Sequence, residues 1–127
     1  MILCMDKVIS WFEIPALDLG RARAFYETLF GVSLQDYKTD AQEMAIFPYN
    51  RETSTGGCLK KASAFEPSAI GTLVYLETGT ELDTVLSRAA AHGGSVALPR
   101  TALPPGQGAY AHIIDTEGNR VGLHGTN

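Results

Sequence analysis

The chain has 127 residues, of which 45% are hydrophobic and 19% charged, and it carries a formal net charge of −4. This length suits one domain with an apolar core that needs no disulfide or metal, and no apolar run approaches the roughly 20 residues that span a bilayer. The acidic balance argues against non-specific nucleic-acid binding, which needs clustered Lys and Arg. It favours neutral or cationic small molecules as ligands. Two distant cysteines, Cys4 and Cys58, and a Met1–Met5 start unlike a signal peptide favour a reduced, cytoplasmic setting.

The first half of the chain is organised around one strand and one helix. Aromatic and branched residues from Ile9 onward predict a strand. Asp18 supplies a carboxylate that suits a helix start, and apolar residues recur every three or four positions until Gly31, a residue that commonly ends helices. Three further strands are predicted at 32–37, 44–47 and 56–60.

The second half repeats this order after a connector at 62–69. A strand is predicted at 72–76, and Thr80 precedes a second apolar helical stripe that stops at Gly93-Gly94. Strands are then expected at 95–98, 109–114 and 121–124, with a proline-containing loop at 99–108. The repeat predicts an α+β fold of two βαβββ modules, 6–61 and 70–126, in one domain 1–127. Two such units would share a concave, ligand-binding face.

Several short motifs in this order resemble the vicinal oxygen chelate superfamily, which includes glyoxalase I, bleomycin-resistance proteins and extradiol dioxygenases. The motifs are Trp11–Pro15, Arg23–Tyr26 with Phe30-Gly31, Gly93-Gly94, and Asp115–Asn119 followed by Gly122-Leu123. The likeness is greatest to a small glyoxalase-related branch. The resemblance implies a cupped sheet built from two βαβββ modules, and a homodimer.

In metal-using members of that superfamily, each module gives one ligand from its first strand and one from its last. Carried over to this chain, the four positions fall on Trp11, on Leu73 or Gly71, on Cys58 or Gly57, and on Gly122. A divalent metal needs three or four imidazole, carboxylate or thiolate groups, and only Cys58 offers one. We therefore expect no metal site at these positions, and we expect no other cofactor.

Glu13 is the first candidate functional residue. Side chains alternate across a strand, so Glu13 shares the cup-facing side with Trp11. Its carboxylate would accept a ligand donor or act as a base with a raised pKa. The alternative is a structural carboxylate held by an arginine or by a hydrogen bond at the strand end.

Trp11 and Tyr75 occupy comparable places on the first strands of the two modules, where aromatic faces suit planar or cationic ligands. Core or dimer packing is the alternative for both.

The remaining candidates are a cysteine and the histidines. Cys58 is a candidate ligand contact, although no neighbouring feature of the sequence lowers its thiol pKa. His124 shares a face with Gly122 and is a candidate base, with a strand-end role as the alternative. The sequence leaves open which side of its strand His112 faces. His92 lies at the end of the second predicted helix, where a positive imidazole would complement the helix dipole.

Together these patterns predict a metal-independent small-molecule-binding protein whose ligand is unknown, with Trp11, Glu13, Cys58, Tyr75 and His124 at the site. Neither nucleic acid nor membrane is expected as a partner. A glyoxalase-related lyase or isomerase, with Glu13 as catalytic base or with an atypical metal site, is the first alternative. A structural dimeric module without a ligand is the second. Whether the protein is an enzyme stays open at this point.

Overall fold

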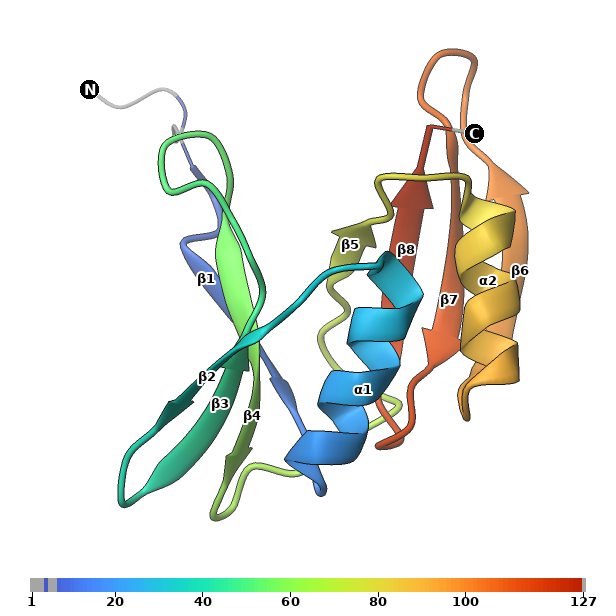
Figure 1. Cartoon of the computed structure of the whole chain (residues 1–127). Coiled ribbons are helices and arrows are strands. Elements are labelled where there is room, and N and C mark those ends of the chain that lie inside the picture. The colour runs from blue at the N-terminus through green and yellow to red at the C-terminus, as the bar shows by residue number, and fades with distance from the viewer. Residues whose placement is uncertain (1–3, 5–6, 127) are drawn as a thin grey trace.

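The computed structural model describes residue 4 and residues 7–126. It contains two modules in sequence, each with one strand, one helix and three further strands, which confirms the predicted α+β architecture (Figure 1). The first module contains β1 (Trp11–Pro15), α1 (Leu19–Phe30), β2 (Gln35–Lys38), β3 (Gln42–Ile46) and β4 (Gly56–Ala62). The second contains β5 (Tyr75–Glu77), α2 (Leu82–Ala91), β6 (Ser95–Ala102), β7 (Ala109–Ile114) and β8 (Arg120–Gly125).

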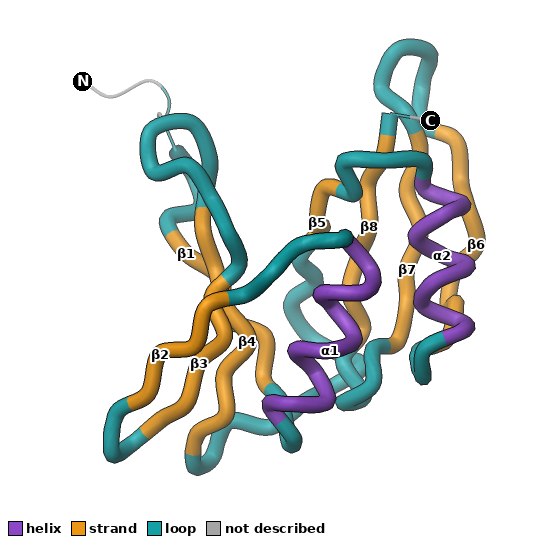
Figure 2. Tube along the Cα trace, viewed as in Figure 1, coloured by secondary structure: helices purple, strands orange, loops and turns teal. Residues whose placement is uncertain are grey.

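Each module forms its own four-stranded sheet, with the order β1-β4-β3-β2 in the first and β5-β8-β7-β6 in the second. The first strand of each module pairs in parallel with the last, and the other pairings are antiparallel. The connector 63–74 crosses from one module to the other (Figure 2). In these strand orders, β1 and β5 are edge strands of their sheets, and they lie on the side where the modules meet.

The first helix has the boundaries that its sequence predicts. The Asp18 carboxylate accepts a hydrogen bond from the Arg21 amide at 3.0 Å, and Gly31 ends the helix in the left-handed conformation with φ of 67°. The second helix differs at its start. Glu81, not Thr80, occupies the cap position, and its side chain makes no capping hydrogen bond.

Two strands of the second module also differ from expectation. β5 covers Tyr75–Glu77 rather than 72–76. β6 continues through Pro99 to Ala102, where a loop was predicted. A proline is tolerated because β6 is the edge strand of its sheet, and its register with β7 shifts on either side of Leu98.

One hydrophobic core lies on the helix-bearing side of both sheets. α1 packs against β3, β4 and α2, while α2 covers β6, β7 and β8. Among the largest fully buried side chains are Tyr26, Leu29, Leu59, Leu82 and Ile113, which come from both modules. The opposite faces of the sheets are thereby left free for polar and aromatic side chains.

A buried polar turn between β7 and β8 joins the second module to the first. Asp115, Glu117 and Asn119 are only 4%, 7% and 5% exposed. Glu117 Oε1 accepts hydrogen bonds from the amides of Leu17 and Asp18, at 2.8 Å each. The Asn119 amide donates to the Pro15 carbonyl at 2.8 Å, at the end of β1. These bonds fix the position of β1 relative to β8.

The same turn reaches the core through Tyr26 of α1. The Tyr26 hydroxyl donates to Asp115 Oδ2 at 2.7 Å, while Asp115 Oδ1 accepts from the amides of Glu117 and Asn119. Burial is the main reason that the pKa of Tyr26 lies well above its ordinary value, and the adjacent Asp115 raises it further. Every buried side-chain nitrogen or oxygen of the described residues has a hydrogen-bond partner.

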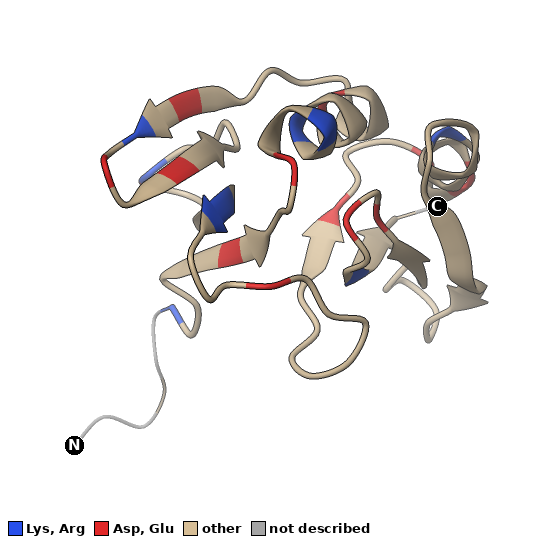
Figure 3. Ribbon diagram, turned by 90° about the horizontal axis from the view of Figure 1, so that it is seen from below, with Lys and Arg blue, Asp and Glu red and all other residues tan. Residues whose placement is uncertain are grey.

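Basic and acidic positions are interspersed along the ribbon of both modules (Figure 3). Of the helices in the described part of the chain, none is long and apolar enough to cross a membrane.

Candidate ligand cleft between the modules

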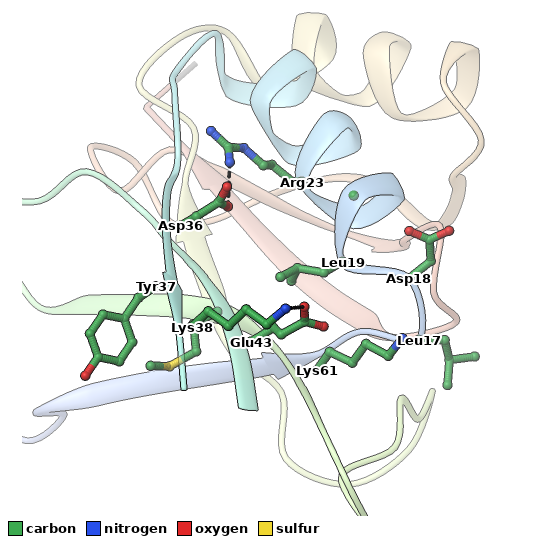
Figure 4. A pocket seen from close by; sticks show the side chains of 11 residues that line it. Leu17, Asp18, Leu19, Arg23, Asp36, Tyr37, Lys38, Glu43 and Lys61 are labelled. Carbon is green, nitrogen blue, oxygen red and sulfur yellow. Dashed lines mark ion pairs between the residues drawn. The ribbon is translucent and has the colours of Figure 1, made fainter. Parts of the chain in front are cut away.

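Two cavities of similar volume are the main candidates for the binding site. The first, of about 590 Å³, lies between the start of α1 and the strands β2 and β3. Two ion pairs already occupy its wall, Arg23 with Asp36 at 2.5 Å and Lys38 with Glu43 at 3.3 Å (Figure 4). Ligand groups would have to displace these ion pairs, so we place the candidate site in the second cavity.

The second cavity, of about 630 Å³, lies where β1 and β5 face each other. This volume is typical of pockets for small ligands. Its walls come from both modules and include Trp11, Glu13, Ile70, Val74, Tyr75 and Arg120. Trp11 and Tyr75 keep 37% and 46% of their surface exposed there. We call this cavity the β1/β5 cleft.

The strand register makes Trp11 and Tyr75 equivalent. Trp11 lies opposite Gly56 in the parallel pair of the first module, and Tyr75 lies opposite Gly122 in that of the second. Each first strand thus places an aromatic residue beside a glycine of the last strand, near the junction of the modules.

At both glycines, an aromatic ring occupies the space that a side chain would need. A Cβ on Gly122 would lie 2.4 Å from the ring of Tyr75, and a Cβ on Gly56 would lie 2.7 Å from the ring of Tyr49. The Tyr49 ring in turn makes an edge contact with Trp11, with the ring centres 5.8 Å apart. These aromatic rings therefore depend on the glycines beneath them.

This register corrects two of the ligand positions carried over from the resemblance. The second-module position falls on Tyr75 instead of Leu73 or Gly71, and the first-module last-strand position falls on Gly56 instead of Cys58 or Gly57. The error arose because α2 begins one residue later than expected, and because β5 begins at Tyr75, seven positions before the start of α2, whereas β1 begins at Trp11, eight positions before the start of α1.

The corrected donor set does not fit a divalent metal. Two of the four positions are glycine, one is an indole, and the fourth is a phenol whose oxygen already contacts a histidine. Such a metal takes imidazole, carboxylate or thiolate ligands. Elsewhere in the described residues, no group of three or more His, Cys, Asp or Glu is placed to hold a metal ion.

Glu13 lines the cleft and is held in an ion pair. Lys60 Nζ lies 3.1 Å from Glu13 Oε1, and the Cys58 thiol lies 3.9 Å from Oε2. Cys58 is fully buried, and this burial is the main reason that its pKa rises to about 11, with the adjacent Glu13 charge second. The thiol is therefore protonated at neutral pH and lies behind Glu13, outside the lining of the cleft.

The second module has a matching pair, Glu77 and His124, at the register position equivalent to Glu13 and Cys58. His124 Nδ1 lies 2.5 Å from Glu77 Oε1, and Nε2 lies 2.8 Å from the Gln107 carbonyl. The hydrogen bond to Gln107 and then that to Glu77 raise the pKa of His124. With an acceptor at each nitrogen, this imidazole ties the 103–108 loop to the sheet.

His112 has the opposite environment. Arg120 approaches its Nδ1 at 3.1 Å, and the Tyr75 hydroxyl lies 2.6 Å from its Nε2. Burial, and then the positive charge of Arg120, lower the pKa of His112. The same sheet face therefore carries one histidine with a lowered pKa and one with a raised pKa.

We expect the two histidines to titrate on opposite sides of the ordinary value of 6.5, His124 above it and His112 below it. An NMR titration of the imidazole signals, assigned with H112Q and H124Q, measures both. Since the raised pKa of His124 belongs to the folded state, its stabilising contribution is complete below pH 6.5 and disappears as the pH rises through the folded-state value. A melting-temperature difference between wild type and H124Q that did not shrink from pH 6 to pH 9 would contradict this assignment.

The structure brings together three of the five residues that the sequence suggested. Trp11, Glu13 and Tyr75 line the β1/β5 cleft, whereas Cys58 and His124 do not. Sequence reasoning left out Tyr49 and Arg120. A usable signal existed for Arg120, because it shares a strand face with Gly122 and His124 by simple alternation.

This fold and cleft define a class: an α+β protein of two βαβββ modules with an aromatic cavity where they meet. The family model for the Glyoxalase/Bleomycin resistance protein/Dioxygenase superfamily matches residues 8–123. The chain belongs to this superfamily.

Solved structures share the fold at low sequence identity. Glyoxalase I from Zea mays aligns with a TM-score of 0.65 at 18% identity, covering 92% of this chain but 45% of the maize protein, so the chain spans less than half of that relative. FosX, a fosfomycin resistance protein from Listeria monocytogenes, aligns at 0.65 and 17% identity over 97% of this chain and 94% of its own. A family enzyme from Burkholderia phytofirmans PsJN aligns at 0.65 and 17% identity over 93% and 98%. Among curated proteins, none matches this sequence.

Proposed function

We propose that the protein binds a small molecule in the β1/β5 cleft without the help of a metal ion, its ligand having a planar, apolar body. The observation that carries the proposal is the pairing of an aromatic ring with a glycine at equivalent positions of both modules. The rings of Trp11 and Tyr75 are partly exposed in the cleft, the Tyr75 ring lies directly against Gly122, and such aromatic rings offer flat contact surface. Membership of the superfamily is compatible with small-molecule binding.

Other roles receive less support. The sequence hypothesis that Glu13 is a catalytic base stays a prediction, and the Lys60 ion pair also suits a structural or ligand-orienting role. The homodimer and the cytoplasmic setting expected from the sequence remain part of the proposal, because superfamily membership alone does not fix either.

The test is ligand binding in the presence of a chelator. A panel of planar aromatic compounds is screened by thermal shift in EDTA, since a compound that binds only the native state raises the melting temperature, and hits are measured by calorimetry. We expect W11L to weaken binding roughly tenfold, a loss of about 1.4 kcal/mol.

The matched control for W11L is Y37L, which removes an exposed aromatic residue of β2 outside the cleft. It should bind like the wild type. Equal losses in both variants, or hits that bind only when a divalent metal is added, would overturn the proposal.

A further inference from the structure

The hydrogen bonds around His112 determine where the proton of Tyr75 points. An arginine has no acceptor, so Arg120 must donate to Nδ1 of His112, which therefore carries a lone pair. A neutral imidazole then holds its proton on Nε2, and that N–H donates to the Tyr75 oxygen at 2.6 Å. The Tyr75 hydroxyl proton takes no part in this hydrogen bond, so the hydroxyl can donate it to a ligand group in the cleft.

Arg120 brings to the same cleft a positive charge that no carboxylate of the described residues balances. It is half-buried, and in the part of the chain that the structure describes it forms no ion pair. Its hydrogen-bonded side-chain partner is the neutral ring of His112. Partly buried charges are ordinarily paired, because their desolvation is otherwise uncompensated.

The acidic residues of the cleft do not supply that partner. Glu13 is paired with Lys60 at 3.1 Å, which cancels its charge locally. Glu66 is exposed on the connector at the rim and makes no ion pair with Arg120. Within the described part of the chain, the wall formed by Tyr75 and Arg120 thus presents hydrogen-bond donors and a positive charge without an ion-pair partner.

We infer that the ligand of the β1/β5 cleft carries an oxyanion, a carboxylate or a phosphate, held by Arg120 and by the hydroxyl of Tyr75. This inference rests on the proposed function, because the planar body of the ligand lies against the aromatic residues described above. His112 is a positioning residue: it fixes the direction of the Tyr75 proton and orients the guanidinium. The net charge of the chain favours the opposite kind of ligand, so the local arrangement overrides the global balance.

The experiment uses probes that share one ring system and differ in one group. Naphthalene-2-carboxylate, 2-naphthyl phosphate and the neutral naphthalene-2-carboxamide are titrated into wild type, R120Q, Y75F and a matched control, R100Q, by calorimetry in EDTA. Arg100 is an exposed arginine of β6 outside the cleft. We expect at least one anion to bind tenfold or more tighter than the amide in wild type and R100Q. This preference should disappear in R120Q and shrink several-fold in Y75F, and the two anions together show whether one or two negative charges fit.

The outcomes test the oxyanion inference and the proposed function separately. Equal binding of amide and anions would overturn the oxyanion inference and leave the proposed function standing, whereas no binding by any probe would count against both. A preference that survived in R120Q would remove Arg120 as the anchor. Independently of any ligand, ¹⁵N NMR must find the proton of His112 on Nε2, and the Nδ1–H form would overturn the assigned direction of the Tyr75 proton. Melting curves of each variant establish that it is folded.

Discussion

Replacing Glu117 with glutamine is expected to lower the free energy of unfolding by about 2 kcal/mol, which for a domain of this size is roughly 8 °C in melting temperature. The Glu117 side chain is only 1% exposed, and Arg21 meets its carboxylate at 2.7 Å. Burial opposes ionisation, but hydrogen bonds from Arg21, the Asp18 amide and the Thr116 hydroxyl outweigh it and hold the pKa of Glu117 at about 2. A shift of this size implies about 3 kcal/mol, which we reduce because Arg21 is 51% exposed and therefore screened.

Because the Glu117 carboxylate titrates, the loss of stability in E117Q depends on pH. The unfolded chain takes up this proton near the ordinary value of 4.5 and the folded protein only near 2. The contribution of Glu117 is therefore complete above pH 4.5 and is lost as the pH falls through 2. Thermal melts of wild type and E117Q should differ most at neutral pH and converge toward pH 2.

The matched control for E117Q is E81Q, because Glu81 occupies the cap position of α2 without a capping hydrogen bond. We expect E81Q to melt within a degree or two of wild type at every pH. Since Glu117 joins the turn before β8 to the segment after β1, E117Q should also weaken probe binding in the cleft. An unchanged melting temperature in E117Q would show that the turn does not hold the modules together.

The fold was predictable because its signals are local and repeated. The cap at Asp18, the stop at Gly31 and the apolar stripe between them lie within one helix, and the second half of the chain shows a similar pattern. Register was harder, because it depends on small differences in loop length. A cap one residue later, and a first strand that begins seven rather than eight positions before its helix, were enough to move the equivalent of Trp11 from Leu73 to Tyr75.

The polar residues of the cleft were harder to predict from the sequence. Net charge is a sum over the whole chain, whereas a ligand responds to the few charges near it, and the pairing of Glu13 with Lys60 is a property of tertiary structure. Likewise, His112 and His124 look alike in the sequence. Their different states follow from the neighbours that the sheet provides, Arg120 for one and Glu77 for the other.

Replacing Gly122 with alanine is expected to weaken binding of the anionic naphthalene probes at least tenfold while lowering the melting temperature by only a few degrees. The new Cβ would lie 2.4 Å from the Tyr75 ring, which must move. Overpacking of this kind costs about 1–3 kcal/mol in a rigid core, but Tyr75 is 46% exposed and can swing outward. The ring then loses its hydrogen bond to His112, and the hydroxyl leaves the position beside Arg120.

The double variant Y75A/G122A separates displacement of the ring from other effects of the alanine. If Gly122 acts only by leaving space for Tyr75, then G122A adds nothing once the ring is gone, and the double variant should bind the probes like Y75A alone. Additive losses would mean that Gly122 contributes in its own right, through backbone freedom or direct contact. The matched control is G20A, where the new Cβ meets only Asp18 Oδ1 at an ordinary 3.6 Å. Alanine favours the helix there, so G20A should keep wild-type affinity and melt no lower, which would tie the loss in G122A to the ring that the glycine supports.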